Sequence, residues 1–195
     1  MSDSSIPVGR VLRSTTSMFT IGTRVLPAEV PLFGALVKAR ISPNCDAFGL
    51  VYEVAIEDDQ LSRQLVAADK PEYVADHRFN RQVPIDISVL IVGHRLGEQV
   101  YQYLPPQPPI ALAKIGTCTR EEIVQFTEEF TFFRTVLYAK DGPADELLAA
   151  ALRTAADARG ETGKRPYLVR AGRELSRLLA FDAVRLEGLL RRIKP

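Results

Sequence analysis

The apolar residues of this 195-residue chain change their spacing at a proline cluster, and this change constrains the fold more than any other feature. From Val8 to about Leu104 they form short β-branched runs separated by turn residues. After the cluster at residues 105–109 they recur every three or four positions, the spacing of one helix face. Strands followed by helices favour a barrel or sandwich with appended helices over an interleaved α/β fold. We therefore expect a small Greek-key-like β-barrel of about six strands, followed by a C-terminal α-helical unit.

Six segments have the composition of strands, either alternating apolar and polar residues or almost wholly apolar. They span residues 8–14, 19–25, 34–41, 47–56, 85–93 and 99–104. Because alternation sends every second side chain inward, we expect one shared interior that includes Val11, Ile21, Val37, Val51, Val89 and Ile91. Residues 57–82 lack a strand pattern and are predicted to be an insertion, with a short helix over Asp58–Ala68. The prolines are interpreted as a rigid exit from the last strand, since proline has no N–H for a ladder.

The helical half begins at a capping box, Thr119-Arg120-Glu121-Glu122, in which the first and last residues cap each other. A single amphipathic helix is predicted to follow, with an apolar stripe of Ile123, Phe126, Phe130, Phe133 and Leu137. We expect further helices over Ala144–Ala158, Arg173–Leu179 and Val184–Ile193, and a turn at Gly160–Arg165. These patterns divide the chain into a barrel at residues 6–117 and a helical unit at 118–195.

Charge is distributed unevenly along the chain. Residues 159–195 hold 10 Lys and Arg against 4 Asp and Glu, a net of +6, whereas residues 1–158 hold 15 against 20, a net of −5. An anionic partner would therefore meet the C-terminus. The alternative is that the basic tail docks on the acidic body of the same chain.

Four arginines of the tail are candidate nucleic-acid-binding residues: Arg173, Arg177, Arg191 and Arg192. Together with Lys194 they fall on short helices that resemble the paired helices of a DNA-binding motif. The same segments carry a leucine stripe: Leu175, Leu178, Leu179, Leu186, Leu189 and Leu190. Arginines that border such a stripe also occur where helices simply pack and the cations stay in water. We favour packing with a solvated basic face.

No motif predicts catalysis, so we expect neither an enzyme nor a bound cofactor or metal. Gly163-Lys164 lacks the glycine spacing and the following hydroxyl of a Walker A loop. The two histidines, His77 and His94, are interpreted as solvated, and with Cys45 and Cys118 they do not group as zinc ligands. The adjacent acids, Asp58-Asp59 and Glu128-Glu129, are expected on solvated faces with nothing to raise a carboxyl pKa.

The localisation expected is cytoplasmic. The polar residues 1–5 do not resemble a signal peptide, and no apolar run approaches the roughly 20 residues that cross a bilayer, so no membrane contact is expected. Two distant cysteines suggest a reducing compartment.

The β half resembles the HAS barrel, the small β-barrel module at the N-terminus of HerA-type ATPases and of ATP synthase catalytic-head subunits. The matching positions are Val8-Gly9-Arg10-Val11-Leu12, Phe19-Thr20-Ile21, Phe33–Ala39, Ala47–Val54, Ile91-Val92-Gly93 and the prolines at 105–109. The resemblance covers roughly residues 6–117. The ATPase domain that follows this module in the family is replaced here by the helices from Thr119 onward.

This resemblance implies an assembly module. We expect a non-enzymatic interaction or adaptor protein that binds a protein partner, such as a separate HerA-like ATPase or a nuclease, or that self-associates. The alternative is a nucleic-acid-binding protein that uses the basic C-terminal helices.

Overall fold

The structure is a computed structural model that describes residues 7–23, 30–56 and 85–194. The predicted insertion at 57–82 and its helix lie outside the described residues. The strands are β1 (Pro7–Ser14), β2 (Met18–Thr23), β3 (Leu36–Ser42), β4 (Cys45–Ile56), β5 (Ile85–Leu96), β6 (Gln99–Tyr101) and β7 (Lys114–Thr117). The helices are α3 (Arg120–Phe126), α4 (Phe132–Leu137), α5 (Ala144–Asp157), α6 (Gly160–Leu178) and α7 (Ala183–Ile193).

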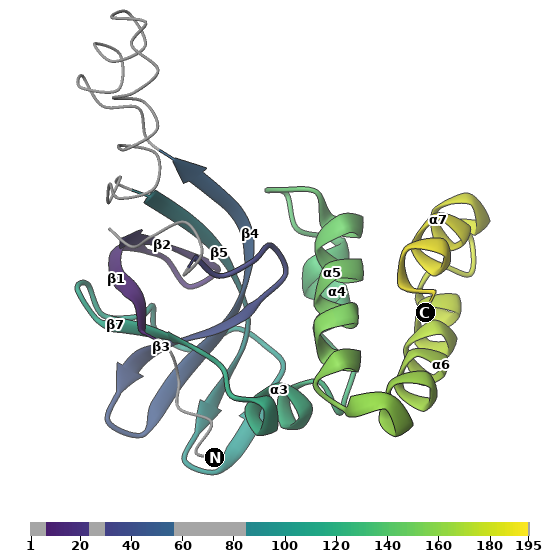
Figure 1. Ribbon diagram of the computed structural model, residues 1–195. Coiled ribbons are helices and arrows are strands. Elements are labelled where there is room, and N and C mark those ends of the chain that lie inside the picture. Colours follow the sequence, from purple (N-terminus) through teal and green to yellow (C-terminus); the bar gives the residue numbers. More distant parts are fainter. Residues whose placement is uncertain (1–6, 24–29, 57–84, 195) are drawn as a thin grey trace, which may run out of the picture.

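The strands form one antiparallel sheet in the order β2-β1-β7-β3-β4-β5-β6, and a further pairing of β2 with β5 closes six of them into a barrel (Figure 1). The predicted barrel with C-terminal helices is therefore confirmed. Its interior is one buried cluster, rich in β-branched side chains, that contains all six predicted core residues: Val11, Ile21, Val37, Val51, Val89 and Ile91. The alternation of apolar and polar residues predicted these core positions correctly, because one face of every strand in a barrel is shielded from water.

The sixth strand of the ring was wrongly predicted. Residues 99–104 were expected to close the barrel, but β6 has three residues and only extends a hairpin from β5. The ring is closed by β7, which lies between β1 and β3 and contributes Ile115 to the core. The prolines at 105–109 therefore lead back into the barrel. Four residues with one buried side chain are too few to show a strand period in sequence.

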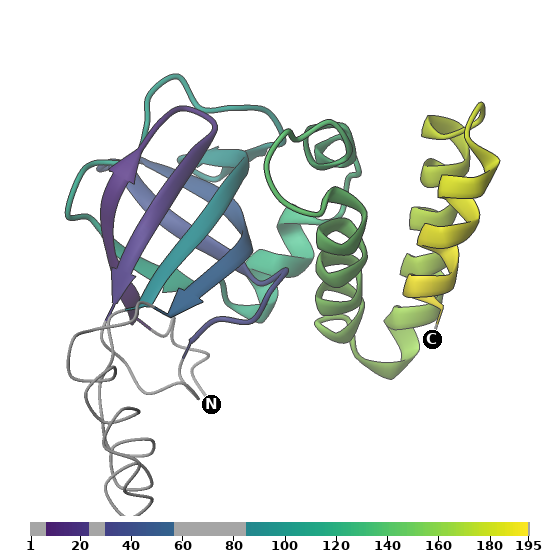
Figure 2. The same ribbon diagram turned by 90° about the horizontal axis from the view of Figure 1, so that it is seen from above.

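The outer wall of the barrel has a second apolar surface, which the helices cover. Leu36, Phe48, Leu50, Leu90 and Val92 share a buried cluster with residues from every helix. The helices lie to one side of the barrel, with α4 and α5 next to the wall and α6 and α7 as the outermost layer (Figures 1 and 2). None of the helices in the described part of the chain is long and apolar enough to cross a membrane.

The single helix expected after the capping box is two helices. Thr119 and Glu122 do cap each other, with Thr119 Oγ1 accepting from Glu122 N and Glu122 Oε2 accepting from Thr119 N. However, α3 ends at Phe126, and α4 begins six residues later. The Gln102 side chain forms hydrogen bonds with the backbone at the break between the two helices. It donates to the carbonyls of Phe126 and Glu129 and accepts from Phe132 N. A residue remote in sequence thus satisfies the freed backbone groups.

The apolar stripe survives this break. Phe126, Phe133 and Leu137 are buried, and Phe130 packs partly buried against Phe133 and against Tyr167 of α6. The stripe therefore joins the barrel wall to the outer helices.

The C-terminal helices differ from the prediction in one respect. Helix α5 and helix α7 lie where they were expected, but α6 begins at Gly160 rather than near Arg173. The prediction of a turn over Gly160–Arg165 is wrong, because these residues belong to α6. Only Gly160, with a φ of 69°, has the backbone conformation of a turn, and it connects α5 to α6. Pro166 lies inside α6, where it has no N–H for the bond to the preceding turn.

Candidate functional site

The four candidate arginines lie on the two outermost helices, Arg173 and Arg177 on α6 and Arg191 and Arg192 on α7. Three are in ion pairs: Arg177 with Glu174, Arg191 with Glu187, and Arg192 with Glu146 of α5. Arg173 is exposed and has no ion pair within the described part of the chain. Because exposed ion pairs contribute little stability, these three contacts do not prevent the arginines from meeting a ligand.

The basic tail does dock on the acidic body, which was the alternative considered from the charge distribution. Arg185 of α7 pairs with Asp145 of α5 at 2.7 Å, and Arg170 of α6 pairs with Glu128 at 2.6 Å. The hydrogen bond from Arg170 keeps the pKa of Glu128 below its ordinary value. Glu128 is therefore the reverse of a general acid, which needs a raised pKa.

Arg159 is the most enclosed of these tail cations. It donates to the carbonyls of Ala155 and Val124 and to Thr127 Oγ1, and its guanidinium carbon lies 3.8 Å from the centre of the Tyr167 ring. Burial raises the pKa of Tyr167 to about 12. Arg159 thus joins the C-terminal ends of α3 and α5 to the face of α6, a structural role.

The two cysteines and His94 are buried within the fold. Both cysteines are free thiols in buried positions, and burial raises the pKa of each. His94 corrects the prediction of a solvated side chain: it is buried on β5 between Tyr101 and Tyr103, and its Nδ1 lies 3.1 Å from the Tyr103 carbonyl. His77 and the pair Asp58-Asp59 lie outside the described residues.

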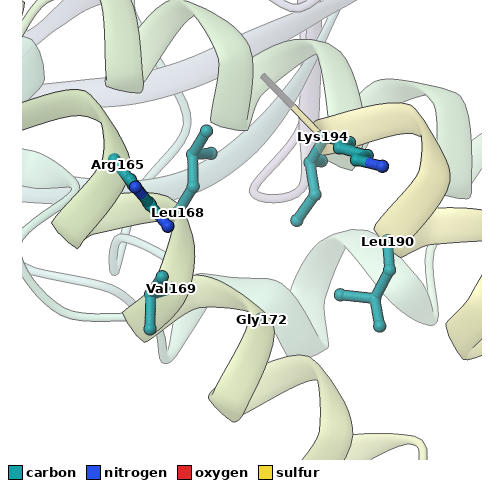
Figure 3. Close-up of a pocket in the computed structure, with 7 residues that line it drawn as sticks. Arg165, Leu168, Val169, Gly172, Leu190 and Lys194 are labelled. Carbon is teal, nitrogen blue, oxygen red and sulfur yellow. The ribbon is translucent and has the colours of Figure 1, made fainter. Parts of the chain in front are cut away.

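An apolar groove opens between the two outermost helices (Figure 3). It has a volume of 490 Å³ and is lined by Arg165, Leu168, Val169 and Gly172 of α6, Leu190 and Ile193 of α7, and Lys194. Val169 is 48% exposed and Leu190 is 37% exposed. Leu168 and Ile193 are buried and form the floor. The groove therefore presents aliphatic side chains to the surroundings.

Gly172 lies on the wall of the groove that faces Leu190. A Cβ built on Gly172 would meet the nearest atom of Leu190 at 3.4 Å, an ordinary contact distance. A larger side chain at this position would therefore extend into the space between the helices. Alanine would raise helix propensity by about 1 kcal/mol, yet glycine stands here.

Positive charge borders the groove. Arg165 and Lys194 line it, and neither forms an ion pair within the described part of the chain. Phe181, at the turn between α6 and α7, is 106% exposed, and Val184, in the first turn of α7, is 86% exposed. The outermost helix pair thus combines uncovered apolar side chains with unpaired cations, the composition of an interaction surface.

Sequence reasoning found the helices but missed the groove. Leucines of the stripe were expected to be buried, and Leu175, Leu179 and Leu189 are, whereas Leu190 is partly exposed. Val169 lies outside that stripe. An apolar residue outside the predicted buried face was the sequence signal that could have indicated the groove. No protein-family model matches the chain, and no curated protein matches it.

Proposed function

We propose that the protein is a non-enzymatic interaction protein whose α6–α7 groove docks an apolar segment of another protein, flanked by carboxylates. The observation that carries this proposal is the exposure of Val169 and Leu190 in a groove bordered by Arg165 and Lys194. An amphipathic helix inserts side chains at positions i, i+3 or i+4, and i+7 into such a groove. Acidic residues beside those anchors would meet the two unpaired cations.

The class of partner comes from the barrel resemblance. The HAS-barrel resemblance implies a small β-barrel, and six of the described strands close into one. It also implies an association with ring-shaped ATPases, on which the barrels of that family are found. We therefore infer a separate HerA-like ATPase or a nuclease as the protein that supplies the docking segment. In this arrangement the barrel positions the helices, and the outermost helices hold the partner.

A designed peptide tests the docking surface directly. The probe is a helical peptide with leucines at positions i, i+3 and i+7 and glutamates on both sides, labelled for fluorescence anisotropy. We expect the Val169→Glu variant to bind it at least tenfold more weakly than the wild type. The control is Val54→Glu, which adds the same charge at a 38% exposed valine on β4.

Two further comparisons decide the outcome. Gly172→Leu should weaken binding without a change of charge, because its side chain fills the groove. A peptide with lysines in place of the glutamates should bind less well. Equal binding by all variants, or preference for the lysine peptide, would contradict the proposal. Loss in Val169→Glu of a complex with the organism's own HerA-like ATPase, measured by gel filtration, would identify the partner class.

The alternative function, nucleic-acid binding by the C-terminal helices, is favoured by one observation. Arg165, Arg173 and Lys194 are exposed and have no ion pair within the described residues. Duplex binding by these cations would weaken steeply with salt, by roughly 0.9 logarithmic units per phosphate contact for each tenfold rise. A titration with a 20-base-pair duplex at two salt concentrations separates this function from peptide docking, which retains its apolar contribution at high salt.

A further inference from the structure

The outer wall of the barrel has a charged cleft, remote from the α6–α7 groove in sequence and fold. It has a volume of 270 Å³ and is lined by Lys38 and Arg40 of β3, Asp46 of β4, Arg95 of β5, and Lys114, Ile115 and Gly116 of β7. The helices cover the apolar part of this wall and leave the charged part open. Sequence reasoning did not single out this cleft, because the segment that contains it has a net negative charge.

A chain of ion pairs organises the cleft. Arg40 and Arg95 both contact Asp46, at 2.6 and 2.7 Å. Arg95 and Lys38 both contact Glu122, the capping residue of α3, at 3.3 and 2.6 Å. The two carboxylates are only 10% and 13% exposed, whereas Arg40 is 54% exposed. Asp46 therefore lies at the base of the cleft and Arg40 at its mouth, while Glu122 holds Lys38 and Arg95 from outside the lining.

Charge does not balance within this cluster. The four cations that line the cleft exceed Asp46 and Glu122 by two positive charges. Lys114 is exposed and has no ion pair within the described part of the chain. Both carboxylates are already shared by two cations each, so the surplus potential at the mouth is positive.

The surplus is also costly to the fold. Lys114 stands directly opposite Arg10 of β1, and the register that pairs Ile115 with Ala39 brings Lys114 beside Arg40 on its other side. Like charges directly opposite each other in neighbouring strands destabilise a sheet. Lys114, which stands between Arg10 and Arg40 without an acidic partner in the described residues, carries a charge that an anionic ligand would balance. Gly116 of β7 is paired with Lys38 of β3. Because glycine has no side chain, the cleft stays open at this position.

We propose that this cleft binds a phosphate-bearing small anion, with a diphosphate group at Arg40, Lys114 and Arg95. Guanidinium groups match the geometry of phosphate oxygens, and a lysine adds a mobile charge. The surplus of two positive charges suits a diphosphate better than a single carboxylate. The shared chemistry is the diphosphate, whether it is free or part of a nucleotide. This site is independent of the α6–α7 groove.

Calorimetric titration at low salt tests the proposal with pyrophosphate, ADP and adenosine. We expect pyrophosphate and ADP to bind and adenosine not to bind. Lys114→Ala should weaken binding at least tenfold, and Lys114→Glu should abolish it. The control is Lys140→Ala, which removes another exposed lysine and should bind as the wild type does. Because Lys114 is exposed, both variants should fold, which circular dichroism checks.

The comparison of the two ligands identifies the source of the phosphate. Equal affinities support a site for the free anion, and tighter binding of ADP supports a nucleotide. Absence of binding at millimolar ligand, or unchanged binding in Lys114→Glu, would overturn the proposal. It would also be overturned if a short single-stranded oligonucleotide bound far more tightly than pyrophosphate and depended on Lys114, because the ligand would then be a nucleic acid.

Discussion

The two basic regions of this protein differ in how their charges are held. On the barrel wall, Asp46 and Glu122 are nearly buried, and each is shared by two cations. On the C-terminal helices, Arg177 and Arg191 are themselves exposed, and each is paired one-to-one with an acid of its own helix. Shared, buried acids order the surrounding cations, whereas exposed pairs exchange readily with water. Net charge along the chain pointed to the tail, yet the more organised cationic site is in the acidic half.

The largest effect should come from removing a shared carboxylate. Glu122→Gln leaves Lys38 and Arg95 without their common partner and weakens the cap of α3. We expect a loss of about 2 kcal/mol in the free energy of unfolding, since hydrogen bonds to charged groups contribute more than neutral ones. Urea denaturation measures it. Glu121→Gln, at the exposed neighbouring position, is the control, and equal losses in both variants would show that the shared pairing is unimportant.

The same carboxylate predicts a dependence on pH. Burial alone would raise the pKa of Glu122, but hydrogen bonds from Lys38 and from the Thr119 backbone outweigh burial, and the pKa is lowered. A lowered pKa in the folded state means that the stabilisation is present above the unfolded pKa of about 4.3 and is lost as pH falls through the folded value. The stability difference between wild type and Glu122→Gln should therefore be constant at pH 6–8 and shrink below about pH 4. A difference that grows in acid would contradict this sign.

The exposed pairs should matter much less. Replacing Arg173, Arg177, Arg191 and Arg192 together with alanine should leave the urea midpoint nearly unchanged, because exposed ion pairs contribute little to stability. If the tail only packs, the replacement should also leave any weak duplex binding and its salt dependence unaltered. Submicromolar duplex binding at physiological salt that disappears in this variant would make the tail the nucleic-acid site.

One substitution is expected to act with the opposite sign. Lys114→Thr removes the like charge that faces Arg10 and introduces a residue favoured in strands. We expect a gain of about 0.2–1 kcal/mol in stability, measured by urea denaturation, together with loss of diphosphate binding. A loss of stability would mean that Lys114 contributes to the fold rather than to a ligand site.

Much of the fold was predictable from residue patterns. Alternation in strands such as Ile85–Leu96 identified the barrel interior, because a one-residue slip would expose a whole face. Helix α5 was predictable from its alanine and leucine content, and the Thr119–Glu122 cap from its spacing. By contrast, β7 is held by partners on β1 and β3, and no local pattern of four residues reveals that pairing.

The candidate sites were less predictable, for the same reason. The groove depends on which side of α6 faces α5 and on the gap that Gly172 leaves beside Leu190. The cleft assembles side chains from four strands, spread from Lys38 to Lys114.

By itself, the sequence determined the class of fold, the composition of the barrel core and the basic character of the tail. These properties depend on local period and composition, which neighbouring residues carry. Only the tertiary structure decided how the ring closes, where α3 ends and which cations remain unpaired. Each of these depends on a partner distant in the chain: β7 between β1 and β3, Gln102 at the helix break, and Glu122 between Lys38 and Arg95.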